Sequence, residues 1–527
     1  MAPADSALPL HAKAVPAMKL SAFLAAAPRE LSGRIVSLLA SATIAAPRAK
    51  KRGGMRIPAA DAAVLLEAGY ITPFTASPLK TSIDAEYFSV IEEEKGRRRP
   101  IIWPAGFLER STYRSRFTLR SVPEYAALVH HGTHAVAFDL ASSFAQVPLS
   151  PNTNIVLSGL DGTRWRVERL PYGIDFAPEV MQLICCQLAD WASAACGHRP
   201  TTAVHIDNVA AVGNLAAVTA WAAAFVGICA EYGVTLNTEA GNVPASVFSF
   251  AGITFDLVEK TVRVRRRLLF PVPDDLPTMT LEDFERVMGR AIFAAAVLRR
   301  SFLPIYFVLK WWRRRLSQLA QGRIPWATHC ALPPGLRRAL VDWLEPLRAN
   351  APVVVPPPQQ KPNSDDLVLA VDATLTGWGA VLLERGAIPS AVGGNFAHHP
   401  ATINDAELLA ALAGVRAFSA RLRDRGVVLL SDNTTTTTAL EKGPLRVHRT
   451  FAAGLVTTEL EQLLDQLKCV VRVGRVETGD NVADAVSRGK PLLASKINPT
   501  LEAGRQTCAG ASPIKTCAGA GGGTAPT

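Results

Sequence analysis

The strongest constraint on the fold of this chain is a set of acidic residues that directly follow short apolar runs. Residues 367–371, LVLAV, form a continuous apolar run of strand length that leads into Asp372. Residues 427–430, VVLL, form a second run that precedes Asp432. Because apolar runs of this length indicate buried strands, both carboxylates are expected at the rim of a sheet.

Two further acidic residues are predicted to lie on helices near the same sheet. Asn404 precedes Glu407 by three residues, which is the spacing of a helix N-cap and its N3 residue, and apolar residues follow with helical period. The segment ADAVSR places Asp484 at the start of another helix. The sequence therefore predicts that four carboxylates converge on one sheet edge.

Carboxylates that lie this close raise one another's pKa unless cations neutralise them. Ligation by oxygen alone suits Mg²⁺ or Mn²⁺, and two such ions can stabilise the attacking and leaving oxygens of a displacement at phosphorus. Each acidic residue taken alone is better explained as a solvated surface group. The prediction of a metal site therefore depends on all of them occurring in order, with their neighbours.

The segments VDATLTGWGA, INDAELLAAL, SDNTTT and NVADAVSR resemble the RNase H domain of retroelement polyproteins, which carries acidic residues in the order Asp, Glu, Asp, Asp. The resemblance implies that Asp372, Glu407, Asp432 and Asp484 are catalytic residues that bind two metal ions. One departure is Arg475, which stands where such domains often carry a histidine that assists product release. Cleavage is expected to survive this change with an altered rate or pH dependence.

The first half of the chain resembles the palm of reverse transcriptases. Residues 135–138, AVAF, form a short apolar strand that leads into Asp139, and Phe144 lies five residues further on. In the first palm motif of that family the Asp binds both metals, and the aromatic residue at this offset screens the sugar 2′ position, so Phe144 is expected to favour deoxynucleotides. RLPYGIDFAPEVMQ, with Tyr172 and Gly173, resembles the segment that lies against the incoming nucleotide and the template.

The segment AVHIDNVAAVG resembles a second palm motif, which usually reads aromatic, any residue, Asp, Asp. Asp207 takes the place of the metal-binding Asp, His205 replaces the aromatic residue, and Asn208 replaces the second Asp. Asn offers a cation only a neutral carbonyl oxygen. Because Asp139 and Asp207 are the two positions that bridge metals in the family, the resemblance implies a weakened site that is not disabled.

Three further segments extend the resemblance. In YGVTLNTEAGNV, Ala240 occupies the position of a Lys that can protonate the leaving pyrophosphate. FSFAGITFDL resembles the primer-gripping hairpin, with Phe250 and Gly252 at its turn. Arg99 belongs to a basic run that resembles the fingers region, where such a residue contacts the triphosphate. A solvated basic loop is the alternative explanation for that run.

Changes in composition and hydrophobic patterning along the chain predict how it is divided into domains. The expected fold is multidomain, α+β and α/β: a right-hand polymerase with fingers, palm and thumb, followed by an RNase H-like domain with a mixed sheet. The predicted segments are, in chain order, a disordered Ala/Pro-rich basic tail (1–60), fingers and palm (75–270), thumb or connection helices (271–348), a Pro-rich linker (349–366), the RNase H-like domain (367–490) and a disordered low-complexity tail (491–527).

Composition favours a polyanionic partner. The net charge of +11 suits nucleic acid, although charge alone would also suit a membrane surface. No apolar run approaches the roughly 18 residues of a membrane span, and no membrane partner is expected. The eight cysteines show no zinc-binding spacing and fit free thiols in a reducing compartment. We expect a protein of the nucleus or cytoplasm of a eukaryotic cell, or of both, that is not secreted.

Among retroelements, LPYGIDFAPE, TGWGA and INDAELLAAL most resemble the DIRS group of tyrosine-recombinase retrotransposons, which includes the VIPER-type elements of trypanosomatids. The resemblance implies an RNA- and DNA-directed DNA polymerase, a nucleotidyltransferase, with a fused RNase H that cuts the RNA strand of RNA/DNA hybrids during replication of a transposable element. The implied partners are an RNA template, a DNA primer, the hybrid and deoxynucleoside triphosphates. The implied cofactors are two Mg²⁺ ions per site, with Mn²⁺ as an alternative.

Two other interpretations stay open. Asn208 and Ala240 would suit a decayed retroelement protein whose polymerase palm is inactive while its RNase H still cleaves. A basic nucleic-acid-binding protein without catalysis is the other, and the intact RNase H carboxylates argue against it. The sequence carries no signal for an oligomeric state.

Overall fold

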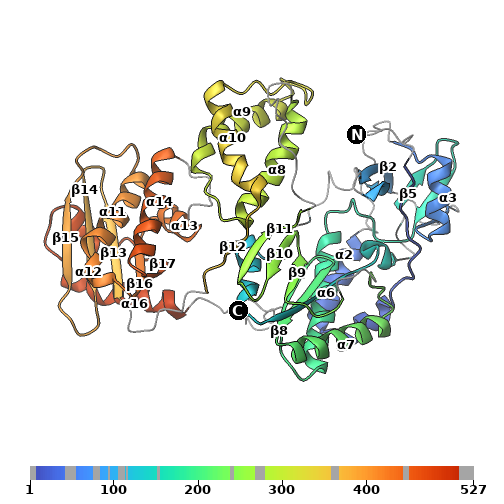
Figure 1. The fold of residues 1–527 in the computed structure, drawn as a ribbon, viewed down its shortest axis with the longest axis horizontal. Coiled ribbons are helices and arrows are strands. Elements are labelled where there is room, and N and C mark those ends of the chain that lie inside the picture. The colour runs from blue at the N-terminus through green and yellow to red at the C-terminus, as the bar shows by residue number, and fades with distance from the viewer. Residues whose placement is uncertain are drawn as a thin grey trace. The chain divides into compact units, whose positions relative to one another are not determined.

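The computed structural model describes residues 8–41, 55–74, 83–92, 95–104, 113, 117–150, 153, 155–237, 242–266, 279–357, 367–442 and 450–509. The chain is a multidomain mixed α/β protein with several sheets, which confirms the predicted fold class (Figure 1). It divides into two compact units, the first extending to Lys260 and the second running from Thr261 to Lys515. No helix within the described ranges combines the length and the apolar character that crossing a membrane requires.

The first unit contains a five-stranded sheet. Its order is β1 (Ile71–Pro73), β6 (Arg164–Val167), β5 (Ile155–Ser158), β2 (Ile83–Glu92) and β3 (Arg97–Trp103). β2 and β3 pair antiparallel, with Glu92 opposite Arg97 and Val90 opposite Arg99. Because successive side chains of a strand point to opposite faces, Arg97 and Arg99 share one face of β3 and Arg98 lies on the other, where it is buried.

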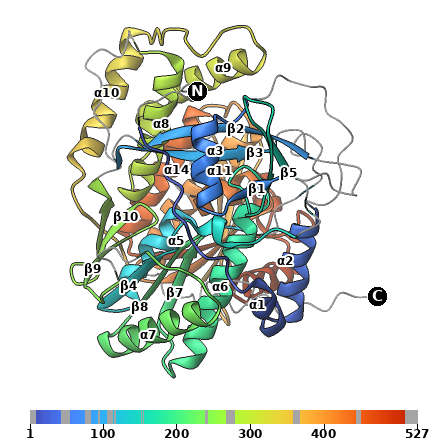
Figure 2. The same ribbon diagram turned by 90° about the vertical axis from the view of Figure 1, so that its right-hand side faces the viewer.

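A three-stranded sheet brings the two predicted palm motifs together. Its order is β4 (His134–Asp139), β8 (Asn208–Gly213) and β7 (Thr201–His205), and its register places Asp139 opposite Asn208. Helices α6 (Ala177–Ala195) and α7 (Leu215–Glu231) lie alongside it (Figure 2). The hairpin of β9 (Val247–Phe250) and β10 (Ile253–Asp256) lies in the predicted segment FSFAGITFDL.

The prediction of a disordered tail over residues 1–60 is wrong for residues 8–41. Helices α1 (Leu20–Ala26) and α2 (Arg29–Ser41) lie there, and α3 (Ala59–Glu67) begins inside the same range. The side chains of Phe23 and Ile35 are fully buried, and the Phe23 ring packs 5.2 Å from that of Trp191. Although Ala and Pro are frequent here, a few larger apolar side chains recur at helical spacing. Their burial packs the segment against the rest of the first unit. Residues 1–7 and 42–54 lie outside the described residues.

A buried ion pair joins α3 to β3, and its arginine also contacts the N-terminal segment. The guanidinium of Arg98 donates two hydrogen bonds to the Asp61 carboxylate, at 3.0 and 2.9 Å, and a third to the Leu8 carbonyl oxygen at 2.7 Å. The Tyr87 hydroxyl donates to the same carboxylate at 2.7 Å. Burial, followed by the hydrogen bond and charge of Asp61, raises the pKa of Tyr87. These contacts compensate the buried charges of Arg98 and Asp61. Removal of either side chain would leave the other as an unpaired buried charge.

We predict that Asp61→Ala destabilises the protein by about 3–5 kcal/mol, because it leaves the buried Arg98 guanidinium without its carboxylate. Denaturant unfolding followed by tryptophan fluorescence measures the change. Asp84→Asn is the matched control, since its carboxylate is exposed and lies 3.6 Å from Arg164, and its cost is expected to stay below about 1 kcal/mol. Equal losses in the two variants would contradict the prediction.

The second unit begins with a short strand pair and a group of helices. β11 (Thr261–Val264) pairs antiparallel with β12 (Val353–Val354). The helices α8 (Leu281–Val297), α9 (Tyr306–Ala320) and α10 (Pro334–Ala349) fall within the predicted thumb or connection segment. Residues 358–366 of the predicted linker lie outside the described residues.

A five-stranded mixed sheet forms the core of the C-terminal part. Its order is β15 (Ser390–Asn395), β14 (Gly377–Leu383), β13 (Leu367–Ala373), β16 (Gly426–Ser431) and β17 (Val470–Arg475). β13, β16 and β17 run parallel, while β14 is antiparallel to both of its neighbours. The central strands β13, β14 and β16 are buried on both faces, which explains why β13 is a continuous apolar run.

Helices cover both faces of this sheet (Figure 1). α11 (Ile403–Ala417) and α14 (Phe451–Gln466) contribute to the hydrophobic core on one face. α15 (Ala483–Ser487) and α16 (Ile497–Ala509) lie against the other. The prediction of a disordered tail over residues 491–527 is therefore wrong for residues up to 509, because Ile497 and Leu501 pack onto the sheet. Residues 510–527 lie outside the described residues.

Candidate active sites

The parallel pairing of β13 with β16 brings two predicted acidic residues to one edge of the sheet. Asp372 is the penultimate residue of β13, and Asp432 follows the last residue of β16. Glu407 reaches the same edge from α11. The predicted N-cap at Asn404 is wrong: α11 begins at Ile403, and the Thr402 side chain caps it by accepting a hydrogen bond from the Asp405 amide. Glu407 therefore lies two residues, about half a turn, further into the helix than predicted.

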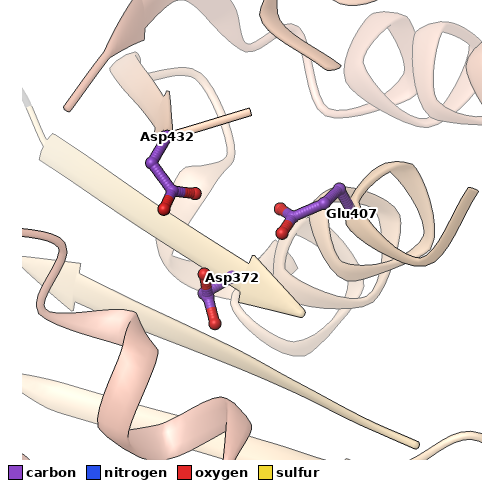
Figure 3. Close-up of side chains that lie close together, drawn as sticks. All are labelled: Asp372, Glu407 and Asp432. Atoms are coloured by element: carbon purple, nitrogen blue, oxygen red, sulfur yellow. The ribbon is translucent and has the colours of Figure 1, made fainter. Parts of the chain in front are cut away.

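Asp372, Glu407 and Asp432 form a compact carboxylate cluster (Figure 3). One oxygen from each of the three lies within 4.8 Å of the others. Asp372 and Glu407 are buried, whereas Asp432 is half-buried. This is the only group of three or more His, Cys, Asp or Glu side chains with such spacing in the part of the chain that the structure describes.

Burial and mutual repulsion perturb this cluster strongly. Burial, followed by the charges of Asp372 and Asp432, raises the pKa of Glu407 to about 8. Burial likewise raises the pKa of Asp372 to about 6, although the Ser487 hydroxyl donates a hydrogen bond to its carboxylate. An oxygen-only donor set of this charge fits a hard divalent cation such as Mg²⁺ or Mn²⁺, which would relieve the repulsion.

Asp484, the fourth predicted ligand, lies beside the cluster but is held by cations of its own. Its carboxylate accepts a hydrogen bond from Arg488 Nε at 2.9 Å and lies 3.5 Å from Lys496 Nζ. Burial favours a raised pKa for Asp484, but Arg488 and Lys496 outweigh it and lower the pKa. Ser487 connects the two groups, since its hydroxyl lies 2.9 Å from the Asp484 carbonyl oxygen and also contacts Asp372. The structure thus brings three of the four predicted acids together and places the fourth as a neighbour.

We predict that a divalent cation binds this cluster more weakly as the pH falls from about 8 to 6, because the cation must displace a proton from Glu407, whose pKa is about 8. Calorimetric titration with Mg²⁺ at several pH values measures the effect and the released proton. Glu407→Gln should weaken binding and reduce the pH dependence. Glu461→Gln is the control, because burial raises the pKa of Glu461 to about 7 on a different helix.

The same shift predicts the pH dependence of stability without a cation. The folded-state pKa of Glu407 lies above its ordinary value of 4.5, so its contribution to stability is complete below pH 4.5 and is lost as the pH rises towards about 8. Added Mg²⁺ should therefore raise the melting temperature more at pH 8 than at pH 6. A larger increase at pH 6 would contradict the assignment of Glu407 to the cation site.

The second predicted site lies at the hairpin of β7 and β8. Asp139 is the last residue of β4, and Asp207 occupies the turn between His205 and Asn208. Ile206, the first residue of that turn, has φ +59°, a conformation that a β-branched residue rarely adopts. The side chain of Gln182 on α6 accepts a hydrogen bond from the Ile206 amide at 2.7 Å. This contact holds the turn that presents Asp207.

Side-chain amides bind both carboxylates of the second site. Asn208 Nδ2 lies 3.0 Å from Asp207 Oδ1 and 3.4 Å from Asp139 Oδ1. Asn237 Nδ2 donates to Asp139 Oδ2 at 2.7 Å, and the Ser143 hydroxyl donates to Asp207 Oδ2 at 2.8 Å. Sequence reasoning missed Asn237, although it lies in the same quoted segment as Ala240, which is outside the described residues. Neutral donors therefore offset part of the repulsion between Asp139 and Asp207.

The residues predicted to contact the nucleotide lie near these carboxylates. The rings of Phe144 and Tyr172 pack 4.7 Å apart, and the Arg99 guanidinium lies 5.7 Å from the Tyr172 ring. Burial mainly raises the pKa of Tyr172 to about 12, and the charges of Asp207 and Asp139 contribute to the increase. The charges of both acids therefore affect the pKa of the Tyr172 hydroxyl.

Gly173 is required by a close approach of two backbones. A Cβ atom at this position would lie 2.6 Å from the Ile102 carbonyl oxygen and 2.8 Å from Trp103 Cα. Any larger residue would displace β3 from the segment that carries Tyr172. Gly173 thus allows the segment that carries Tyr172 to lie directly against β3.

Tyr125 connects the predicted primer-gripping hairpin to the Asp207 turn. Its ring packs edge-on against Phe250 at 5.5 Å and against His205 at 5.7 Å, and its hydroxyl lies 3.1 Å from His205 Nδ1. Gly252, with φ +81°, completes the turn after Phe250. His205, which stands where the resembled motif usually has an aromatic residue, therefore packs against the aromatic ring of Tyr125. No sequence pattern identified Tyr125.

No protein-family model matches the chain, and no curated protein matches it. Solved structures of foamy viral protease-reverse transcriptase resemble it at low identity. The form denoted dRH, in complex with double-stranded DNA, is 14% identical with a TM-score of 0.45, over 87% of this chain and 81% of that one. The protein in complex with double-stranded DNA is 13% identical with a TM-score of 0.45, over 87% and 97%. The protein in complex with RNA/DNA hybrid is 14% identical with a TM-score of 0.46, over 87% and 62%.

Proposed function

We propose that this chain is an RNA- and DNA-directed DNA polymerase with a fused RNase H, which serves retrotransposon replication in the nucleus or cytoplasm of a eukaryotic cell. The observation that carries the proposal is the carboxylate cluster, in which oxygens of Asp372, Glu407 and Asp432 lie within 4.8 Å of one another at a sheet edge. Two buried carboxylates and a half-buried third are costly when all three are ionised, and a divalent cation would offset this cost. The fitting cations are those that assist phosphodiester chemistry.

In the proposed RNase H site, Asp372, Glu407 and Asp432 would hold a divalent ion, and Asp484 would contribute once Arg488 and Lys496 release it. Bound ions supply charge neutralisation at the scissile phosphate and a more acidic water molecule. Ser487 orients the Asp372 carboxylate through its hydrogen bond. Arg488 is a half-exposed cation beside the acids, suited to contact the RNA strand.

In the proposed polymerase site, Asp139 and Asp207 would hold the ions that assist attack by the primer 3′ hydroxyl. Phe144 is fixed by its contact with Tyr172, so a ribose 2′ hydroxyl would meet a rigid ring. Arg99 would bind the triphosphate of the incoming nucleotide. The Phe250 hairpin would hold the primer, because Tyr125 connects it to the turn that carries Asp207.

A second candidate function is supported by a specific observation. The polymerase site has two carboxylates, and the amide of Asn208 lies where a third would stand and contacts both. Two acids with neutral partners attract cations less strongly than three acids do. The chain would then be an RNase H whose polymerase half binds nucleic acid without extending primers.

Primer extension on an RNA template with Mg²⁺ and deoxynucleotides distinguishes the two functions. We expect the natural chain to extend the primer and Asp139→Ala to lower the rate by about 100-fold or more, the scale on which one electrostatic group acts in an active site. Asp84→Asn, a charge change at an exposed position of β2, is the control. Extension that appears only after Asn208→Asp would favour the second candidate.

Cleavage of the RNA strand of a labelled hybrid tests the other half independently. We predict that Asp432→Asn lowers cleavage by about 100-fold or more while primer extension is preserved, because the altered side chain belongs to the separate cluster. Asp480→Asn, an exposed residue of the same unit, should leave cleavage unchanged. Hybrid cleavage that survives loss of Asp432 would contradict the proposed RNase H site.

A further inference from the structure

A short segment, residues 235–237, lies against the end of the strand that carries Asp139. Its Thr235 carbonyl oxygen accepts a hydrogen bond from the Ala141 amide at 3.0 Å. The Asn237 amide donates to the Asp139 carbonyl oxygen at 2.8 Å, and an isolated antiparallel bridge lies between these two bonds. Backbone pairing therefore fixes residues 235–237 against Asp139.

From this position the Asn237 side chain orients the Asp139 carboxylate. Asn237 Nδ2 donates a hydrogen bond to Asp139 Oδ2 at 2.7 Å. The other oxygen, Asp139 Oδ1, faces the Asn208 amide nitrogen, which also lies 3.0 Å from Asp207 Oδ1. Because Asn237 holds one oxygen, the second is directed toward the side of Asp207. Hydrogen bonds of this kind set the orientation of carboxylates that bind metal ions.

Gln146 connects residues 235–237 to the strand end from inside the protein. Its side chain is buried, and Nε2 donates to the Ala141 carbonyl oxygen at 2.6 Å and to the Thr235 carbonyl oxygen at 2.9 Å. Gln146 Oε1 accepts a hydrogen bond from the Thr235 amide at 2.7 Å. Both polar atoms of this buried side chain thus bind the two segments, so a displacement of Gln146 would disturb both of them.

The N-terminal segment, residues 8–41, donates backbone hydrogen bonds to both supports of this arrangement. The Met18 amide donates to the Gln146 carbonyl oxygen at 2.8 Å. The Lys19 amide donates to the Tyr232 carbonyl oxygen at 2.8 Å, and Lys19 Nζ donates to that of Glu231 at 2.9 Å. These carbonyl groups belong to the last residue and the C-cap of α7, where a helix has no partner of its own for them. Lys19 therefore caps α7, and its positive charge is favourable at that end of a helix.

Aromatic packing holds this cap in place. Phe23 is fully buried, and its ring lies 5.8 Å from the Tyr232 ring and 5.2 Å from the Trp191 ring. The rings of Trp191 and Tyr232 stack 4.9 Å apart. Tyr232 thus contacts the N-terminal segment through both its ring and its carbonyl oxygen. Since only two residues separate Tyr232 from Thr235, a shift of the cap would be transmitted to residues 235–237.

We propose that residues 18–23 are a positioning element of the candidate polymerase site. They hold Gln146 and the C-terminus of α7, and these two hold residues 235–237, from which Asn237 orients Asp139. This inference rests on the proposed polymerase function. All of these contacts lie within the first unit, so the carboxylate cluster of the second unit is independent of them.

Hydrogen exchange in the full chain, without added metal, tests the connection. Lys19→Pro removes both Lys19 donors, and the φ of −74° at this residue suits proline. Exchange at the amides of Thr235 and Asn237 should become about threefold to tenfold faster, the scale on which one hydrogen bond acts. Arg29→Pro is the matched control: it also exchanges a cation for proline, but at the first residue of α2, where a helix makes no use of the backbone N–H.

A second variant weakens the same cap without changing the backbone. Phe23→Leu keeps an apolar side chain but loses the ring contact with Tyr232. It should accelerate exchange at Thr235 and Asn237 in the same direction as Lys19→Pro. Circular dichroism and the melting temperature establish that each variant is folded. Unchanged exchange in the folded variants, or equal acceleration in Arg29→Pro, would overturn the connection.

Primer extension tests whether the connection positions Asp139. Asn237→Ala should lower kcat by about tenfold or more, as is typical when a metal-binding side chain loses the partner that orients it. Lys19→Pro should lower kcat by about threefold to tenfold through the weaker cap. The KM for deoxynucleotides should change by less than about twofold, because the nucleotide contacts are unaltered. Cleavage of the RNA strand of a hybrid by the same variants should be unchanged.

The two measurements separate failure of this inference from failure of the proposed function. If the natural chain extends primers and a folded Asn237→Ala variant retains its kcat, the positioning role is wrong. It is also wrong if Lys19→Pro shows faster exchange but retains its kcat. If exchange accelerates as expected while the natural chain extends no primer, the connection stands and the polymerase assignment fails. Faster exchange together with a lower kcat and an unchanged KM supports both.

Discussion

Repulsion between carboxylates that strand pairing forces together is the physical constraint on which both candidate sites depend. The parallel register of β13 and β16 fixes Asp372 and Asp432 at one sheet edge, and the register of β4 and β8 fixes Asp139 beside the Asp207 hairpin. The protein resolves the repulsion differently in the two places. At the first site burial, followed by the charges of Asp372 and Asp432, raises the pKa of Glu407 to about 8, and a cation would offset this charge. At the second, amides of Asn208 and Asn237 bind the acids directly.

The positions of the acidic residues could be predicted because each depends on a local pattern. A short apolar run followed by Asp indicates a strand end, and the structure places Asp139, Asp372 and Asp432 at or directly after strand ends. The cap of α11 was misplaced because Thr402 and Asn404 are both good capping residues, and only the backbone conformation selects between them. Gln182 and Asn237 could not be found, since their roles arise from contacts between segments distant in sequence.

Amino-acid composition predicted the structure less well than local sequence patterns did. Residues 8–41 were expected to be disordered from their Ala and Pro content, yet Phe23 is fully buried and Arg98 donates to the Leu8 carbonyl oxygen. A few well-spaced apolar residues outweigh a biased average. The basic run in β3 shows the same limit of composition, because identical side chains have opposite environments. Strand alternation buries Arg98 against Asp61 and leaves Arg97 and Arg99 on the other face, a distinction that charge counting cannot make.

Asn208 contributes contacts of its own to the second site. Its amide donates toward both Asp139 and Asp207, so an aspartate in its place would replace two favourable contacts with two like-charge contacts. The contacts of Asn208 matter for the Asp207 turn because Ile206 in that turn already adopts an unfavourable backbone conformation. Compared with an aspartate, Asn208 would therefore lessen the repulsion between the two acids and would also lower their affinity for a cation.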